Sequence, residues 1–115
     1  MRRSALIIAA AVVAQSLAAL PAFAGQCYEG IGCVSSQYAP KSELKKLSCQ
    51  NLWTVRNRIY KDNGYCFKTQ TGINEMGNDG CTIVNQGAVP LNAYESGNIG
   101  TIRSVEKAKG CNYGG

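Results

Sequence analysis

Residues 48–67 of this chain read SCQNLWTVRNRIYKDNGYCF, and this stretch decides the fold. Its apolar residues recur at steps of three and four, which is the spacing of one face of an α-helix: Leu52, Val55 and Ile59. Ser48 is a good N-cap, because its hydroxyl can accept a hydrogen bond from a backbone N–H in the first turn. Gly64 suits the left-handed position that ends many helices. The sequence therefore predicts a helix over 49–62, with Gly64 as its C-terminal cap.

Two more helices are expected after this one. A short helix is predicted over 70–76, and 77–90 is predicted as a long loop because it contains three glycines and a proline. Asn92 and Glu95 have the spacing of a capping box, which opens a last helix that ends at Gly110. The apolar face of that helix is formed by Ile99, Ile102 and Val105. The expected fold class is mainly α, a small domain of about three helices with long Gly-rich loops.

Residues 1–24 have the pattern of a secretory signal peptide. Two arginines begin the chain, 5–20 is an apolar stretch, and the small residues Ala22 and Ala24 provide a cleavage site. Cleavage after Ala24 leaves 91 residues with ten basic and seven acidic side chains, a net charge of +3. An uncleaved membrane anchor is disfavoured, because the stretch is short and Ala-rich. We expect a periplasmic or secreted protein with no transmembrane span after cleavage.

The mature chain has few residues that form a core. Leu, Ile, Val and Phe account for 16 of its 91 residues, and all 13 glycines lie in it. Such a composition is close to the level at which chains fail to fold unaided. Six cysteines in an exported chain of this size indicate disulfide bonds that stabilise the thin core. A zinc site is the alternative, and the lack of His and of any Cys-x-x-Cys pair disfavours it.

The predicted main helix restricts how the cysteines can pair. A helix of this length spans about 20 Å. Cys49 and Cys66 therefore cannot bond to each other, because the Cα atoms of a disulfide lie within about 7 Å. Several pairings remain, and the sequence alone does not choose among them. We favour a small local loop, a clamp around the short helix and a tie between the two long helices: Cys27–Cys33, Cys66–Cys81 and Cys49–Cys111.

The stretch 47–67 resembles the YARHG domain family. The family pattern is an Arg-Asn-x-Ile-Tyr step, which stands here at Arg56 to Tyr60, followed by a Tyr-Ala-Arg-His-Gly motif. Tyr60 and Gly64 match that motif, whereas 61–63 are Lys, Asp and Asn in place of Ala, Arg and His.

The later part of the chain, 91–106, is similar to the segment that closes such domains. The resemblance covers 41–111 and implies a small extracytoplasmic bacterial module with no assigned molecular function. It divides the mature chain into an irregular N-terminal arm at 25–40, a YARHG-like helical domain at 41–111 and a C-terminal tail at 112–115.

The most distinctive polar residues are Arg56, Asn57 and Tyr60. Arg56 and Tyr60 are four residues apart and share a helix face. They could form a small anion or glycan site, with a forked donor and a stacking ring. A structural role is favoured, in which Arg56 pairs with Glu95 or Glu106 and Asn57 satisfies loop backbone groups, because a thin core needs ties between helices. Four aromatic residues could likewise form a platform for sugars or bases: Trp53, Tyr60, Tyr65 and Phe67. Core filling is the simpler interpretation for Trp53 and Phe67.

Catalysis finds little support in this sequence. The chain has no His, oxidised cysteines offer no thiolate nucleophile, and the acidic residues form no close pair of the kind that glycosidases use. We expect no enzyme activity, no cofactor and no metal site. The preferred function is a non-catalytic exported binding or structural module of the bacterial cell envelope.

Two alternative functions stay open. One is a secreted inhibitor or effector that docks on a partner protein, and the other is a small carboxylate-dependent hydrolase. The candidate partners are a cell-wall polymer, an anionic lipid and an envelope protein. No nucleic acid is expected, because a net charge of +3 gives only a weak attraction to phosphate chains.

Overall fold

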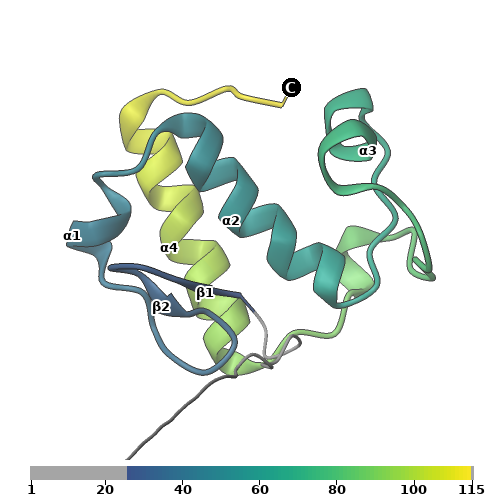
Figure 1. The fold of residues 1–115 in the computed structure, drawn as a ribbon, viewed down its shortest axis with the longest axis horizontal. Helices are drawn as coiled ribbons and strands as arrows, with labels where there is room; N and C mark the ends of the chain where they lie inside the picture. Colours follow the sequence, from purple (N-terminus) through teal and green to yellow (C-terminus); the bar gives the residue numbers. More distant parts are fainter. Residues whose placement is uncertain (1–25, 115) are drawn as a thin grey trace, which may run out of the picture.

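The computed structural model describes residues 26–114. These residues form four α-helices, a two-stranded antiparallel hairpin and one turn of 3-10 helix (Figure 1). The helices are α1 (Lys41–Leu44), α2 (Cys49–Asp62), α3 (Gln70–Met76) and α4 (Ala93–Lys109). The hairpin pairs β1 (Cys27–Tyr28) with β2 (Gly32–Cys33), and the 3-10 turn η2 is Gln86–Ala88. The fold is mainly α, as predicted, and the predicted signal peptide 1–24 lies outside the described residues.

Helix α2 has the two ends that its sequence predicts. The Ser48 side chain accepts a hydrogen bond of 3.0 Å from the backbone N–H of Asn51. Asn63 is the C-cap, and Gly64 follows it with a φ of 96°. A Cβ at Gly64 would lie 3.3 Å from the Thr82 hydroxyl oxygen, so both the backbone conformation and the neighbouring loop favour glycine there.

Helix α4 also begins and ends as predicted. The Asn92 side chain accepts from the backbone N–H of Glu95 at 2.8 Å, and the Glu95 carboxylate accepts from the backbone N–H of Asn92 at 2.9 Å. This reciprocal pair is a capping box. Gly110 ends the helix in the left-handed conformation, with a φ of 70°. The middle of the helix buries its apolar face against the rest of the domain.

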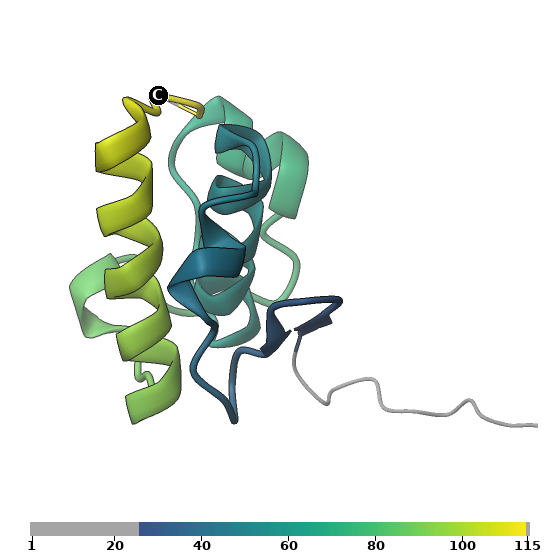
Figure 2. The same ribbon diagram turned by 90° about the vertical axis from the view of Figure 1, so that its left-hand side faces the viewer.

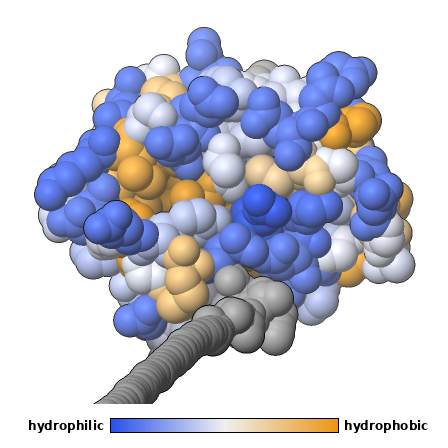
Figure 3. Space-filling model, viewed as in Figure 1, coloured by the Kyte–Doolittle hydropathy of each residue, from blue (hydrophilic) through white to orange (hydrophobic). Residues whose placement is uncertain are grey.

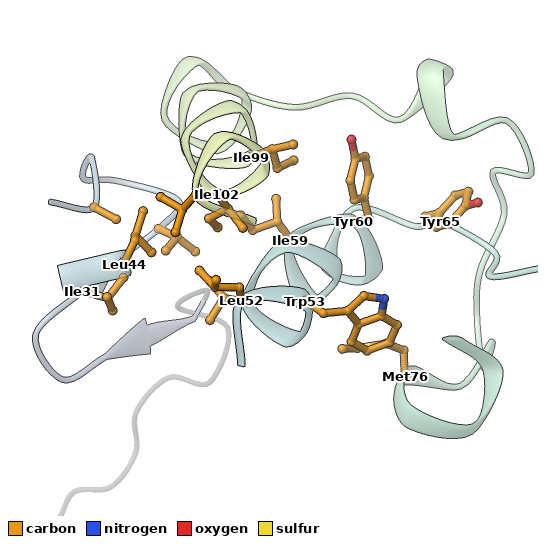
Figure 4. Packing of buried hydrophobic residues seen from close by; sticks show 14 of the residues in the cluster. Ile31, Leu44, Leu52, Trp53, Ile59, Tyr60, Tyr65, Met76, Ile99 and Ile102 are labelled. Atoms are coloured by element: carbon orange, nitrogen blue, oxygen red, sulfur yellow. The ribbon is translucent and has the colours of Figure 1, made fainter. Parts of the chain in front are cut away.

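Helix α2 lies between α4 and α3 (Figure 2). On the side of α4, the core contains Leu44 of α1, Leu52 of α2 and Ile102 of α4, each with no exposed surface. On the side of α3, Trp53 lies beside Met76 (Figure 4). The two sides belong to one continuous hydrophobic cluster that runs around α2.

The segment 25–40 differs from the irregular arm that the sequence predicts. It contains the hairpin, closed by Cys27–Cys33, and three of its residues are buried in the core: Ile31, Val34 and Ala39. This segment therefore supplies part of the core that the helices share.

Asn98 of α4 holds this segment in place. Its side chain is 1% exposed, donates to the carbonyl oxygens of Val34 and Gln37, and accepts from the backbone N–H of Ala39. These hydrogen bonds are 2.8–2.9 Å long. The contact joins residues about sixty positions apart, which explains why local sequence patterns do not reveal it.

All six cysteines are paired in the structure. The bonds are Cys27–Cys33, Cys49–Cys111 and Cys66–Cys81, the same pairing that the sequence favours. The second bond joins the first residue of α2 to the residue that follows the C-cap of α4. The third brackets α3, and beside it Tyr65 forms a parallel β-bridge with Ile83. Ile83, which lies in the segment that the sequence predicts as a long loop, therefore pairs with the chain that leaves α2.

Candidate functional site

A cavity of about 280 Å³ lies between α2, the segment 65–69 and the last residues of the chain. We call it the α2–tail cavity. Its walls combine aromatic rings, amide groups and cationic side chains. The lining residues are Trp53, Arg56, Asn57, Tyr65, Phe67, Lys68, Thr69, Gln86, Tyr113 and Gly114. Concave sites of this composition bind small molecules or the ends of larger ones.

One wall of the cavity comes from α2 and the segment that follows it. Trp53, Arg56 and Asn57 lie three and four residues apart, so they share one face of the helix. Phe67 is fixed by Asn78, whose side chain accepts from the Phe67 N–H at 2.7 Å and donates to the Phe67 carbonyl at 3.0 Å. The Cys66–Cys81 bond holds the same segment beside α3. Two hydrogen bonds and a disulfide therefore fasten this wall.

The opposite wall is the C-terminal tail, residues 112–114. It runs from the end of α4 toward α3 (Figure 1). The Tyr113 ring meets Trp53 edge-on at 5.5 Å between centroids, and its hydroxyl donates to Glu75 of α3 at 3.2 Å. Gly114 contacts the Trp53 indole so closely that a Cβ would collide with it. Desolvation and the neighbouring Glu75 carboxylate, which accepts the hydrogen bond of the hydroxyl, raise the pKa of Tyr113 above its ordinary value.

Arg56 forms a two-pronged ion pair with Glu106 of α4. Its Nε donates to one carboxylate oxygen at 2.8 Å and its Nη2 to the other at 3.0 Å. The two side chains are only 14% and 12% exposed. Of the two partners that the sequence predicts for Arg56, the structure selects Glu106, because Glu95 is occupied in the capping box. The third nitrogen, Nη1, has no hydrogen-bond partner among residues 26–114, and Arg56 lines the cavity.

The other two members of the predicted polar cluster have different places. Asn57 lines the cavity and donates to the Trp53 carbonyl of its own helix at 2.9 Å, so the expectation that it satisfies loop backbone groups is wrong. Tyr60 does not line the cavity. It is 7% exposed, packs against Tyr65, and its hydroxyl accepts from Arg103 at 3.4 Å. Figure 4 shows Tyr60 and Tyr65 in the core beside the end of α2.

The cavity lining contains two cationic side chains, one of which, Arg56, is paired with Glu106. The other is Lys68, and none of the described lining residues is a carboxylate. Sequence reasoning missed Lys68, Gln86 and Tyr113. Lys68 follows the recognisable stretch, whereas Gln86 and Tyr113 reach the cavity only because disulfides bring the loop and the tail back to α2. Trp53 and Phe67 fill the core as predicted and also expose an edge to the cavity.

A second cavity, of about 240 Å³, is mostly apolar. It is lined by the hairpin, Leu47 and the adjacent face of α2, and includes Ile31 and Val55. Figure 3 shows apolar surface on this side of an otherwise mainly hydrophilic face. The pKa of Tyr28, which lies in the wall of this cavity, is raised. Burial is the main cause. The Arg58 guanidinium opposes the effect, and the Asp62 carboxylate adds to it. Few polar groups converge here, so the α2–tail cavity is the better candidate site.

Two further features bear on the chemistry and the setting of the protein. Within residues 26–114, no group of three His, Cys, Asp or Glu side chains is arranged to hold a metal ion. No helix in that range combines the length and the apolar character needed to cross a bilayer.

The residues that correspond to the YARHG motif join α2 to α4. Tyr60 is buried, and Asn63, which stands at the His position, donates to the Ile59 carbonyl at 2.8 Å and to Glu95 at 3.2 Å. This end of α2 is thus tied to the first turn of α4.

The chain matches no curated protein and no solved structure. The family model of the YARHG domain matches residues 29–107, well over half of the chain. The match begins inside the hairpin turn, in agreement with the contribution of that segment to the core. The chain therefore belongs to the YARHG domain family.

Proposed function

We propose that this protein is a non-catalytic, exported binding module of the bacterial cell envelope, and that the α2–tail cavity is its ligand site. The observation that carries the proposal is the cavity lining. Lys68 and Arg56 stand among aromatic rings and amides, and Arg56, although paired with Glu106, keeps Nη1 without a hydrogen-bond partner among residues 26–114. Such a site suits a ligand that has an anionic group and a flat or apolar face.

The three disulfides support an extracytoplasmic location. Bonds of this kind persist in oxidising compartments, which include the bacterial periplasm and the exterior. The predicted signal peptide at 1–24 agrees with export. A periplasmic or secreted protein meets the polymers and lipids of the envelope, many of which carry negative charge.

The hydrolase alternative gains no support from the cavities. A carboxylate-dependent glycosidase needs two carboxyl groups facing one cleft, roughly 5–10 Å apart. The apolar cavity contains one acidic residue, Glu29. Glu106 borders a separate groove along α4 and is paired with Arg56. Glu95 is held in its capping box.

The alternative of a docking inhibitor is favoured by one observation. Tyr38 and Tyr94 lie beside each other, 4.8 Å between ring centroids, and are 61% and 40% exposed. Exposed tyrosines on a fixed backbone are typical of protein interfaces. If the protein is an inhibitor, a stoichiometric protein complex will be recovered from an envelope extract, and Tyr38→Ala will abolish it.

The test of the binding module is retention of the oxidised mature protein on insoluble cell-wall material. We expect retention at low salt that weakens as salt rises, because a cationic site contributes to it. Lys68→Ala should reduce retention. Lys41→Ala removes the same charge from an exposed position on α1 and should leave retention unchanged. No retention of the parent protein, or equal losses in both variants, would contradict the proposal.

A further inference from the structure

A larger groove lies on the other side of the Arg56–Glu106 ion pair. Its volume is about 450 Å³, and it is open to solvent along the last turns of α4. We call it the α4 groove. Arg103, Lys107 and Asn112 line it, together with Arg56 and Tyr113. Because Arg56 and Tyr113 line the α2–tail cavity as well, the two hollows meet at these residues.

The α4 groove holds cations that lack acidic partners. Both oxygens of Glu106, the one carboxylate among the described lining residues, accept hydrogen bonds from Arg56. Arg103 donates to the Tyr60 hydroxyl, and within residues 26–114 neither Arg103 nor Lys107 forms a salt bridge. The two lie one helical turn apart, so they face the same stretch of groove.

We propose that the two hollows form one binding path and that the ligand is a segment of an acidic glycan, with anionic groups on at least two of its sugars. This inference rests on the proposed function. One anionic group lies near Arg56 and Lys68 in the α2–tail cavity, and a second lies between Arg103 and Lys107 in the α4 groove. The sugar ring between them crosses the Arg56–Glu106 pair beside Tyr113.

The lining favours a glycan over a membrane surface. Trp53 offers an edge and Tyr113 a partly exposed ring to a sugar, and Asn57 and Gln86 carry amides that can donate to and accept from its hydroxyl groups. Both hollows are concave, whereas a lipid surface is bound by a flat or convex face that is basic or amphipathic. The openness of the α4 groove also suits a chain that continues into solvent.

Trp53 provides a direct readout, because it is the single tryptophan of the chain and lines the path. Its fluorescence can be titrated with galacturonic acid oligomers from monomer to hexamer, which carry one carboxylate on each ring. We expect affinity to rise with length until both hollows are filled and then to level off. Maltohexaose, a neutral oligomer, should not bind.

The variant Arg103→Gln/Lys107→Gln separates the two parts of the path. Loss of two partly exposed charges should weaken hexamer binding by about tenfold, while binding of the monomer changes little. Lys41→Gln/Lys45→Gln makes the same change of net charge at exposed positions of α1 and the residue after it, and should leave both affinities unaltered.

The outcomes distinguish this inference from the proposed function. If the monomer binds but length and the groove variant have no effect, the single path is wrong and the α2–tail cavity alone is the site. If the protein ignores all oligomers and is not retained on cell-wall material, the proposed function fails as well. Binding to phosphatidylglycerol vesicles that is lost in the groove variant, without oligomer binding, would replace the glycan with a membrane surface.

Discussion

Single buried polar residues fix positions that this protein cannot fix with apolar packing alone. Asn98 is the clearest case, because it satisfies three backbone groups of the segment that follows the hairpin. A buried amide of this kind gives direction to a contact, whereas an aliphatic side chain would only fill the space. Glu95 acts similarly at the start of α4, where it accepts from Ser35, Asn63 and Asn92.

Asn98→Ala should therefore destabilise the protein strongly. The change leaves the Val34 carbonyl and the Ala39 N–H buried without partners and the Gln37 carbonyl partly buried without one, and each fully buried group costs roughly 1–3 kcal/mol. We expect the free energy of unfolding to fall by about 3 kcal/mol or more, as measured by urea denaturation of the oxidised protein.

The matched control is Asn74→Ala on the exposed face of α3, where the amide oxygen accepts only from Gln70. That variant should lose less than about 0.5 kcal/mol. Equal losses in the two variants would show that Asn98 does not hold the segment.

At the scale of helices, the Arg56–Glu106 pair ties α2 to α4 beside both hollows. Its side chains are mostly buried, so removal of either partner leaves a desolvated charge. We expect Arg56→Met and Glu106→Gln each to lower the free energy of unfolding by about 2–3 kcal/mol, and the double variant to lose less than the sum. A double-mutant cycle measured by urea denaturation gives the coupling.

The exposed pair Lys46–Glu43 in and after α1 serves as the reference for that cycle. It has the same kind of charges, but its side chains are 70% and 35% exposed. Its coupling should be below about 0.5 kcal/mol. If the coupling free energy of Arg56–Glu106 is no larger than that of Lys46–Glu43, the pair does not stabilise the fold.

The elements differ in how far the sequence predicts them. The ends of α2 and α4 depend on contacts within four residues, as at Ser48 and in the Asn92–Glu95 box, and local patterns are sufficient for these. The segment that follows the hairpin is held against the core by Asn98, which lies about sixty residues further along the chain. Local patterns therefore predict only an irregular arm at 25–40. Long-range contacts of this kind leave no periodic signal.

The candidate site shows the same division. Arg56 and Asn57 could be singled out because they are distinctive polar residues of one predicted helix. Gln86 and Tyr113 could not, because their place in the cavity depends on how two disulfides close the chain. The favoured cysteine pairing implied that closure, but not which side chains it would bring to α2.

For the whole molecule, the Cys49–Cys111 bond is the most important covalent tie. It links residues 62 positions apart, and a loop of this size should contribute about 4 kcal/mol through the entropy of the unfolded chain. The double variant Cys49→Ser/Cys111→Ser should melt at a much lower temperature, as followed by circular dichroism. Both cysteines are replaced so that neither is left as a free thiol that could react with the other disulfides.

The hairpin bond gives the comparison. Cys27–Cys33 closes a loop of only 6 positions, so Cys27→Ser/Cys33→Ser should lose about 2 kcal/mol. If loss of the hairpin bond lowers the melting temperature as much as loss of Cys49–Cys111, the long-range bond is not the principal covalent tie of the fold.

The same Cys49–Cys111 bond fixes the start of the C-terminal tail, in which Tyr113 and Gly114 contact Trp53. A chain in which this bond is reduced has no covalent tie at the start of that tail, so one wall of the α2–tail cavity then depends on the contacts of Tyr113 and Gly114 alone. If this cavity is the ligand site that we propose, the reduced protein should bind more weakly than the oxidised one. An oxidising compartment, in which such bonds persist, would then both stabilise the fold and complete the site.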